Sequence, residues 1–219
     1  MDENDPIFPH QIKIARELSS YFEKVFVITN KMQLPIPKLS NNIIVKSLEW
    51  QTNHPISNTF RLLKVFLYFQ RKYSIQIVFS HMTEVQSAII APITRFLRIF
   101  HVLWYAHKAK SNYLLWNNFW IDRILTSTRA SCPIQSSKVF AIGQGVDETL
   151  FTFSTKRDYS EKYRWIHVGR IDPSKKIELI ISSFESNSNF LGCSELILVG
   201  ESSFANNWYA DFIESLIIN

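Results

Sequence analysis

The 219 residues include only two cysteines, Cys132 and Cys193. They are too few for a disulfide framework and lack metal-ligand spacing, so we expect a reducing compartment such as the cytoplasm. The amino-terminal segment is acidic and polar and lacks the pattern of a signal peptide. No apolar run is long enough to cross a membrane. The five glycines form no GxGxxG dinucleotide fingerprint, and Gly143 and Gly145 instead suit a turn at a domain hinge.

The net charge is mild, at +5, and lysines and arginines are scattered along the chain. A basic chain can bind nucleic acid, anionic lipid or a phosphorylated small molecule. No nucleic-acid motif is visible, so nucleic acid is not an expected partner. Between Ile93 and Tyr105, Arg95, Arg98 and His101 interleave with apolar residues. This segment either docks peripherally on the inner face of a membrane, or is a helix that packs on a sheet and leads into a buried strand.

Strand and helix patterns alternate along the chain, as they do in βαβ units. The expected helices lie near 14–22, 57–73, 83–100, from 175 onward and 204–218. The expected strands lie near 25–28, 43–45, 75–79, 102–105, 123–127, 138–142, 165–168 and 195–199. Because these strands are continuously apolar, they predict parallel sheets covered on both faces.

A polar stretch at 152–162 separates two β-rich regions and is predicted to be an interdomain linker. Residues 1–151 then form a Rossmann-like N-terminal domain. Residues 163–219 contain only two expected strands, whereas a stable doubly wound sheet usually has four or more. We therefore expect this region to be the first βαβα part of a second Rossmann-like domain.

The segment Trp165 to Glu185, WIHVGRIDPSKKIELIISSFE, is an apolar strand that turns sharply into a helix. Asp172 and Pro173 suit an N-cap and a first helical position. Helix starts usually carry acidic residues, yet this one has Lys175 and Lys176, and Arg170 follows the strand. A bound phosphate would explain these cations. Lysines that are simply solvated would explain them equally well.

A resemblance favours the phosphate. The run Val168-Gly169-Arg170, followed after a few residues by a lysine, comes after Gly145-Val146-Asp147 and Phe151. This pattern is similar to the signature of the family-four retaining glycosyltransferases, which have the GT-B fold. The resemblance implies sugar transfer from a nucleotide-diphosphate sugar to a sugar or lipid-linked acceptor, with retention and with neither a metal nor a further cofactor.

The resemblance also implies roles for particular residues. The donor diphosphate would contact Gly169, Arg170, Lys175 and Lys176, with Lys176 replacing the family's usual glycine. In the segment Leu103 to Lys108, LWYAHK, His107 is the catalytic candidate because it resembles the family's strand-end histidine near the transferred sugar.

Two further histidines are acceptor-side candidates. His81 follows an expected strand, and open α/β sheets bind ligands beyond the carboxyl ends of their strands. His10 stands at the start of the first helix and could approach the same edge. His167 lies within an apolar strand and is expected to line the core or a cleft wall.

Against the family pattern the chain looks truncated at both ends. The family's first strand and glycine-rich turn should precede Asp5, and its paired donor-binding glutamates should follow Asn219. Two alternatives to an active transferase therefore remain open. One is a noncatalytic remnant that binds a carbohydrate, a lipid or a partner, and the other is a sugar-nucleotide epimerase of GT-B shape.

Overall fold

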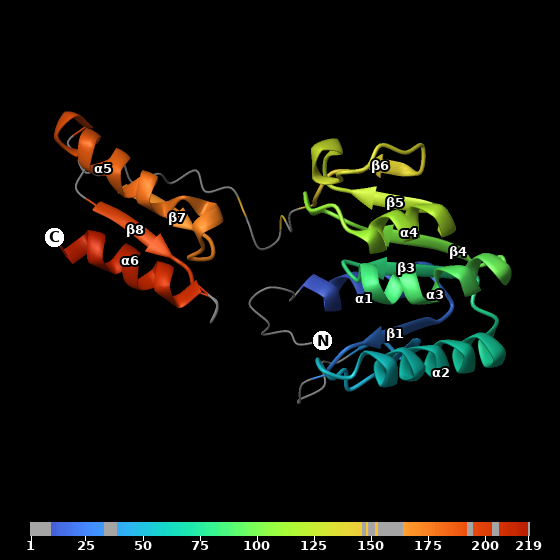
Figure 1. Ribbon diagram of the computed structural model, residues 1–219. Helices are drawn as coiled ribbons and strands as arrows, with labels where there is room; N and C mark the ends of the chain where they lie inside the picture. Colours follow the sequence, from blue (N-terminus) through green and yellow to red (C-terminus); the bar gives the residue numbers. More distant parts are fainter. Residues whose placement is uncertain are drawn as a thin grey trace. The chain divides into compact units, whose positions relative to one another are not determined.

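The computed structural model describes residues 10–32, 39–145, 148, 152, 164–191, 195–202 and 206–218. The chain divides into two compact units, Met1–Val146 and Asp147–Asn219. Of the predicted linker, only Thr152 is among the described residues. In the described part of both units each pair of neighbouring strands is parallel, and α-helices connect most of the successive strands (Figure 1).

The first unit contains two sheets. A two-stranded sheet pairs β1 (Val25–Thr29) with β2 (Ile43–Ser47), after helix α1 (His10–Tyr21). A four-stranded sheet has the order β3-β4-β5-β6, with bounds Ile77–His81, Phe100–Trp104, Arg123–Thr126 and Val139–Ala141. The helices α2 (Pro55–Tyr73), α3 (Glu84–Phe96) and α4 (Asn112–Trp120) connect successive strands. A single turn of 3₁₀-helix, Arg129–Ser131, lies between β5 and β6.

Helix α2 shows why these segments fold as the periodicity predicts. Pro55 occupies its first turn, where a missing N–H is harmless, and Ser74 ends it in the left-handed region. Its buried stripe of Asn58, Leu62, Phe66 and Phe69 repeats at helical spacing. Leu62 and Phe66 of this stripe pack into a core that also receives residues of β1, β3 and α3. This shared core joins the two sheets in one unit. Its buried residues are Leu48, Leu62, Phe66, Ile90 and Ile99.

The sequence did not predict α4. Its apolar residues surround the helix instead of forming a stripe: Leu114 is buried, whereas Leu115, Trp116 and Phe119 are exposed. The sequence did contain an N-cap residue for this helix, Ser111. Its hydroxyl accepts a hydrogen bond from the Leu114 N–H at 3.0 Å.

Several boundaries differ from the prediction, and two of them change the interpretation of particular residues. Helix α3 ends at Phe96 rather than near residue 100, because Arg98 has a φ of 56° and Phe100 already begins β4. Strand β3 extends to His81, so this histidine is the last residue of the strand and does not follow it.

The prediction that both faces of the four-stranded sheet are covered is only partly met. Helices α3 and α4 cover one face, where the core contains Ala91, Leu103, Tyr105, Leu114, Ile121, Ile124, Cys132, Ile134 and Val139. The alternate residues Ile77, Phe79, Phe100 and Phe140 point away from this core and are 37–46% exposed. Within the described residues, full coverage of both faces is therefore not observed.

A buried histidine connects the helices to the sheet. His101 of β4 is 0% exposed. Its Nε2 lies 3.0 Å from the Ser80 hydroxyl and 3.1 Å from the Ser87 hydroxyl, and its Nδ1 lies 3.0 Å from the Thr94 hydroxyl. Strand β3 and helix α3 thus supply all three hydrogen-bond partners of the ring.

The surrounding bonds define the proton on this ring. Thr94 donates to the Ala91 carbonyl at 2.9 Å, so its oxygen accepts from the His101 Nδ1–H. Ser87 donates to the Asn117 side chain at 2.7 Å, which leaves Ser80 to donate to Nε2. Burial lowers the pKa of His101 to about 4, although nearby Asp122 acts in the opposite direction. The ring is therefore neutral in the folded state.

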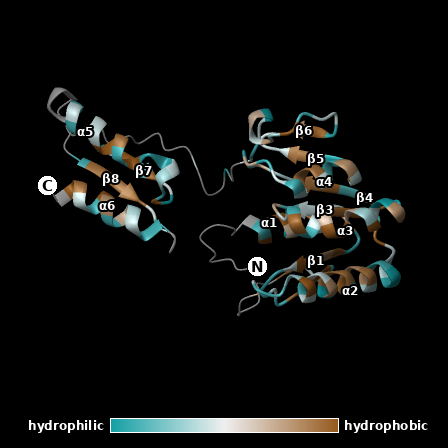
Figure 2. Ribbon diagram, in the orientation of Figure 1, coloured by the Kyte–Doolittle hydropathy of each residue, from teal (hydrophilic) through white to brown (hydrophobic). Residues whose placement is uncertain are grey.

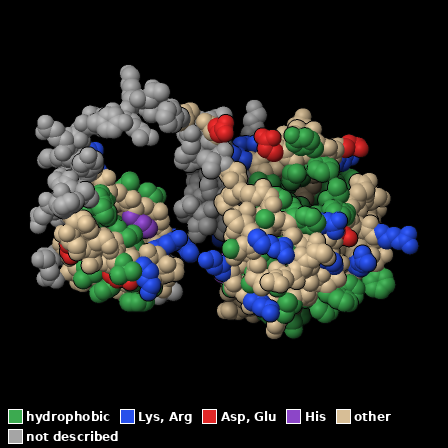
Figure 3. All heavy atoms as spheres, turned by 90° about the horizontal axis from the view of Figure 1, so that it is seen from above, with side chains coloured by type: hydrophobic (Ala, Val, Ile, Leu, Met, Phe, Trp, Pro, Cys, Tyr) green, Lys and Arg blue, Asp and Glu red, His purple; other side chains and the backbone are tan. Residues whose placement is uncertain are grey.

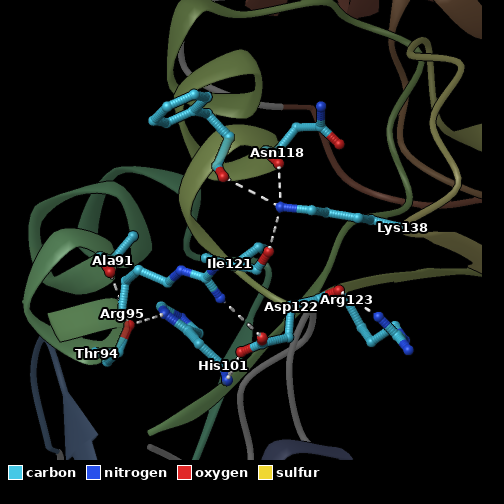
Figure 4. Close-up of polar contacts among 10 residues, drawn as sticks. Ala91, Thr94, Arg95, His101, Asn118, Ile121, Asp122, Arg123 and Lys138 are labelled. Atoms are coloured by element: carbon cyan, nitrogen blue, oxygen red, sulfur yellow. Dashed lines mark hydrogen bonds and ion pairs between the residues drawn. The ribbon is translucent and has the colours of Figure 1, made fainter. Parts of the chain in front are cut away.

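The amino-terminal edge of the same sheet carries a second polar cluster (Figure 4). The Lys138 ammonium donates to the carbonyls of Asn118, Phe119 and Ile121 at 2.8, 3.1 and 2.7 Å. These carbonyls belong to the carboxyl end of α4, where a cation offsets the negative end of the helix dipole. Burial is the main cause that lowers the pKa of Lys138.

The second unit is a βαβα arrangement, as predicted. It contains β7 (Arg164–Val168), a 3₁₀ turn (Pro173–Lys175), α5 (Ile177–Leu191), β8 (Glu195–Val199) and α6 (Asn207–Ile218). Strand β8 is hydrophobic after Glu195, whereas β7 also contains Arg164 and His167, and the two helices are of mixed polarity (Figure 2). Ile177 and Ile181 of α5 pack on Tyr209 and Ile213 of α6 to form the core.

No helix within the described ranges combines the length and apolar character needed to cross a bilayer.

We predict that acid destabilises the first unit through His101. The pKa of this histidine is depressed from 6.5 to about 4 on folding, so the unfolded chain binds a proton that the folded chain does not. The stabilisation is complete above pH 6.5 and falls by about 3 kcal/mol as the pH drops to 4. Urea unfolding as a function of pH measures this loss.

The matched variants are His101→Gln, which cannot take up the proton, and His54→Gln at an exposed position. The first variant should show a shallower pH dependence between 6.5 and 4 than the wild type, and the second an unchanged one. Equal slopes in all three proteins would contradict the neutral buried ring.

Candidate functional site

The loops that follow β7 and β8 are held together beyond the strands. The Gly169 N–H donates to the Val199 carbonyl at 2.9 Å, and the Ile171 N–H donates to the Glu201 carbonyl at 3.0 Å. Ile171 and Ser202 also form a parallel bridge. The carboxyl ends of the two strands, where open α/β sheets bind ligands, therefore form a fixed edge.

Gly200 permits this close approach. A β-carbon at position 200 would lie 1.7 Å from the Gly169 carbonyl oxygen, so only glycine fits there without a shift of the backbone. The sequence pointed to Gly169 but gave Gly200 no role other than the end of a strand. A glycine at the end of the second strand was the signal that could have found it.

The helix after β7 begins later than predicted. Asp172 and Pro173 do cap a helical turn, and the Asp172 carboxylate accepts from the Ser174 N–H at 2.9 Å. That turn is 3₁₀ and ends at Lys176, whose φ of 53° is left-handed. Helix α5 then starts at Ile177 and carries Glu178 in its first turn. The prediction that Lys175 and Lys176 stand in the first turn of this helix is therefore wrong.

The family that the sequence resembles usually has glycine where this chain has Lys176. The left-handed backbone conformation of Lys176 gives a physical reason for that glycine. Glycine adopts positive φ without a steric penalty, whereas a residue with a β-carbon is strained there by about 1 kcal/mol or more. The lysine thus adds a cation to the loop at the expense of backbone strain.

Tyr209 of α6 occupies the amino end of α5. Its hydroxyl accepts from the Ile177 N–H at 2.9 Å and donates to the Glu178 carboxylate. The hydrogen bond from Tyr209 to Glu178 is the main cause that lowers the pKa of Glu178. Burial is the main cause that raises the pKa of Tyr209. The first amide of α5 is therefore engaged within the protein, and an anion here would have to use side chains and the loop backbone.

The loop cations have acidic neighbours. Hydrogen bonds from Ser174 are the main cause that lowers the pKa of Asp172, and the charge of Arg170 contributes. Asp172 also accepts from the Asn206 side chain at 2.7 Å, which fixes the loop to the start of α6. Lys176 in turn contributes to the lowered pKa of Glu178. The loop is thus a mixed-charge surface, on which Lys175 is exposed.

His167 of β7 adjoins this loop. Its Nε2 lies 3.4 Å from where a β-carbon of Gly169 would be. That nitrogen is buried and, among the described residues, has no hydrogen-bond partner. The sequence assigned His167 to the core or a cleft wall, and its position places an unused polar atom beside the loop.

In the first unit, His81 and Trp104 end neighbouring strands. They are register partners in the β3–β4 pair, and their rings are stacked with centroids 6.4 Å apart and planes 9° apart. The two rings form a half-buried aromatic pair at the carboxyl edge of this sheet. The accessible face of such a pair is suited to contact the apolar face of a ring.

His107 lies in the loop between β4 and α4, at the same edge. Its Nδ1 accepts from the Ala109 N–H at 3.0 Å, so the neutral ring carries its proton on Nε2. Tyr105 holds this loop in place, because its hydroxyl donates a hydrogen bond to the Ala109 carbonyl. Burial is the main cause that raises the pKa of Tyr105. The exposed His107 Nε2–H is therefore a positioned hydrogen-bond donor.

One candidate from the sequence, His10, remains to be placed. His10 is the first residue of α1, and its side chain is outside the described part. Among the described residues, one depression of about 560 Å³ lies on α2, and one of about 420 Å³ lies at the amino-terminal edge of the sheet, beside Arg95, Arg98 and Asp122. In the same part of the chain, no group of three His, Cys, Asp or Glu residues could hold a metal ion.

Solved structures similar to most of this chain include two proteins that, by their names, act on or bind UDP compounds. Anabaena HepE in complex with UDP matches with a TM-score of 0.62 and 14% identity over 89% of this chain. The UDP-GlcNAc 2-epimerase of Methanocaldococcus jannaschii matches with a TM-score of 0.55 and 11% identity over 94% of this chain. The chain has a GT-B-like α/β fold.

The GT-B-like chain spans 65% and 66% of the lengths of these two proteins. No protein-family model and no curated protein sequence matches it. The fold class predicted from the sequence is confirmed. Membership of the family-four retaining enzymes and the predicted site residues stay predictions.

We predict that Gly200→Ala destabilises the second unit. The added methyl group cannot coexist with the Gly169 carbonyl, so the loops after β7 and β8 must separate, at a cost of about 1–3 kcal/mol. Thermal unfolding measures the change. Gly145→Ala is the matched control, since nothing lies within 4 Å of its added carbon. Equal midpoints for the two variants would contradict the close approach.

Proposed function

We propose that this chain binds a nucleotide-diphosphate sugar and functions in glycosyl transfer. The observation that carries the proposal is the fixed edge at the carboxyl ends of β7 and β8, with Gly169, Arg170 and Lys175 in one loop. Support comes from the GT-B-like fold, because one similar structure holds UDP.

The diphosphate contacts the loop after β7. Arg170 and Lys175 supply positive charge to the phosphates, and Lys176 adds a third cation. As the sugar leaves, negative charge develops on the departing diphosphate, which these cations stabilise. The His167 Nε2, which has no hydrogen-bond partner among the described residues, lies buried beside Gly169. Retention of configuration and independence from metal are what the family resemblance implies.

The first unit binds the acceptor at the carboxyl edge of its own sheet. The His107 Nε2–H is held by the bond between its Nδ1 and Ala109, and it donates to a sugar hydroxyl or a phosphate oxygen. The stacked pair of His81 and Trp104 offers a flat face to a sugar ring. The acceptor thus contacts the aromatic pair, whereas His107 is the catalytic candidate that acts on the transferred sugar.

An epimerase is the second candidate, because a UDP-GlcNAc 2-epimerase is similar over most of this chain. Incubation with UDP-sugars, with and without sugar acceptors, separates the two. A transferase yields a glycosylated acceptor and UDP, whereas a 2-epimerase changes the sugar without any acceptor. A noncatalytic remnant binds and yields no product.

We predict that Arg170→Ala and Lys175→Ala each weaken UDP binding roughly tenfold or more, because each removes a charged contact to phosphate. Calorimetric titration with UDP measures the loss, and circular dichroism checks the fold. Arg164→Ala is the matched control: it removes the same charge from the other end of β7, where Arg164 forms an exposed ion pair with Glu195 at 3.3 Å. Identical UDP affinity in all four proteins would refute the assignment.

We predict that His107→Ala lowers the turnover number by about a hundredfold with little change in donor affinity, as expected for a group that acts in the transition state. Steady-state transfer assays measure both quantities. Lys108→Ala, at the next exposed position of the same loop, should retain full turnover. Wild-type turnover in His107→Ala would remove this histidine from the site.

A further inference from the structure

The net positive charge of the chain is concentrated in the segment that runs from the start of α2 to the end of α4. Residues 55–120 contain eight lysines and arginines but one acidic residue, Glu84, so this segment carries +7 while the whole chain carries +5. Helix α2 alone has Arg61, Lys64, Arg71 and Lys72 and no acid. The rest of the chain is therefore slightly acidic, and the positive potential belongs to one region.

The same region exposes large apolar side chains. On α2, Phe60 is 68% and Tyr68 54% exposed, and they alternate with Lys64, Arg71 and Lys72 along the outer face. Lys72 lies over the rings of Tyr68 and Tyr73, so cations and aromatic rings form one surface. The shallow depression on α2 is lined by this face.

Helix α4 extends the apolar part of this surface. Its nine residues, NYLLWNNFW, contain no charged group, and Trp116 and Phe119 are 49% and 72% exposed. Helix α3 packs against both α2 and α4, so the three helices form one layer (Figure 1). At the end of α3, Phe96 is exposed beside Arg95 and Arg98. A different face of the first unit, seen from above the view of Figure 1, carries hydrophobic, basic and some acidic side chains (Figure 3).

We propose that the outer faces of α2 and α4, together with the exposed carboxyl end of α3, dock on an anionic lipid bilayer. Aromatic side chains enter the boundary between headgroups and acyl chains, while lysines and arginines contact the lipid phosphates. Long basic side chains can lie along apolar surface and keep their charge at the headgroups. The proposal is independent of the proposed function, since it uses neither the loop after β7 nor His107.

The composition of the face distinguishes this occupant from others. A second copy of the chain would bring two strongly positive surfaces together, which like-charge repulsion opposes. A nucleic acid would match the cations, but it offers no apolar layer in which the uncharged face of α4 could be buried. An anionic bilayer matches both the charge and the exposed aromatic residues.

Flotation of the full chain with lipid vesicles tests the proposal. Vesicles of phosphatidylcholine with phosphatidylglycerol should bind the wild type, and vesicles of phosphatidylcholine alone should bind it at least roughly tenfold more weakly. Lys64→Glu on α2 should reduce binding to the mixed vesicles roughly tenfold, whereas Lys46→Glu, an equal charge change at an exposed position of β2, should not. Added salt should weaken the binding.

A second pair of variants tests the apolar contribution. Phe119→Ser on α4 should reduce binding severalfold. Tyr21→Ser, which removes a ring that is 80% exposed on α1, should not. Equal binding to both kinds of vesicle, or equal losses in the test and control variants, would overturn the proposal. Binding of a single-stranded oligonucleotide, sensitive to Lys64→Glu and without any binding to vesicles, would also overturn it. UDP titration of the same variants reports separately on the donor loop.

Discussion

Each strand in the described part of the chain pairs in parallel with its neighbour, and a parallel pair requires a crossover rather than a hairpin. This constraint places α3 and α4 on one face of the four-stranded sheet and collects the carboxyl ends of the strands at one edge. The loops that follow those ends carry His107 in the first unit and Arg170 in the second. The candidate site residues are therefore consequences of the topology, each within its own unit.

Polar contacts then fix details that burial of apolar groups leaves undecided. The neutral ring of His101 joins β3, α3 and β4, and the Lys138 ammonium closes the end of α4. In the second unit, Tyr209 and Asn206 connect α6 to the start of α5 and to Asp172. A buried polar group is costly when it has no partner, so these contacts favour a single register of helix on sheet.

The fold could be predicted from the sequence where apolar patterns were continuous. The runs around Val27, Leu103 and Leu198 are strands, and the stripe of α2 is buried as its spacing indicates. Helix α4 could not be predicted from its pattern, because its apolar residues surround it. The boundaries at Arg98 and Lys176 depend on positive φ angles at residues that rarely adopt them, so the composition gave no warning.

The candidate site was predictable only in part. The parallel strands and the family resemblance directed attention to His107, Arg170 and Lys175, and the structure places each of them after the carboxyl end of a strand. Tyr209 and Gly200 could not be found in this way. Their importance comes from contacts across the unit, between α6 and α5 and between the two strand ends, that are distant in sequence.

The central claim is that the strand ends of the second unit bind a nucleoside diphosphate. Titration of the isotope-labelled chain with UDP, followed by amide chemical shifts, tests it most directly. The account predicts saturable shifts at residues 169–178 and 200–202, with little change at the opposite end of β7 near Arg164. Shifts confined to other parts of the chain, or none at saturating UDP, would contradict it.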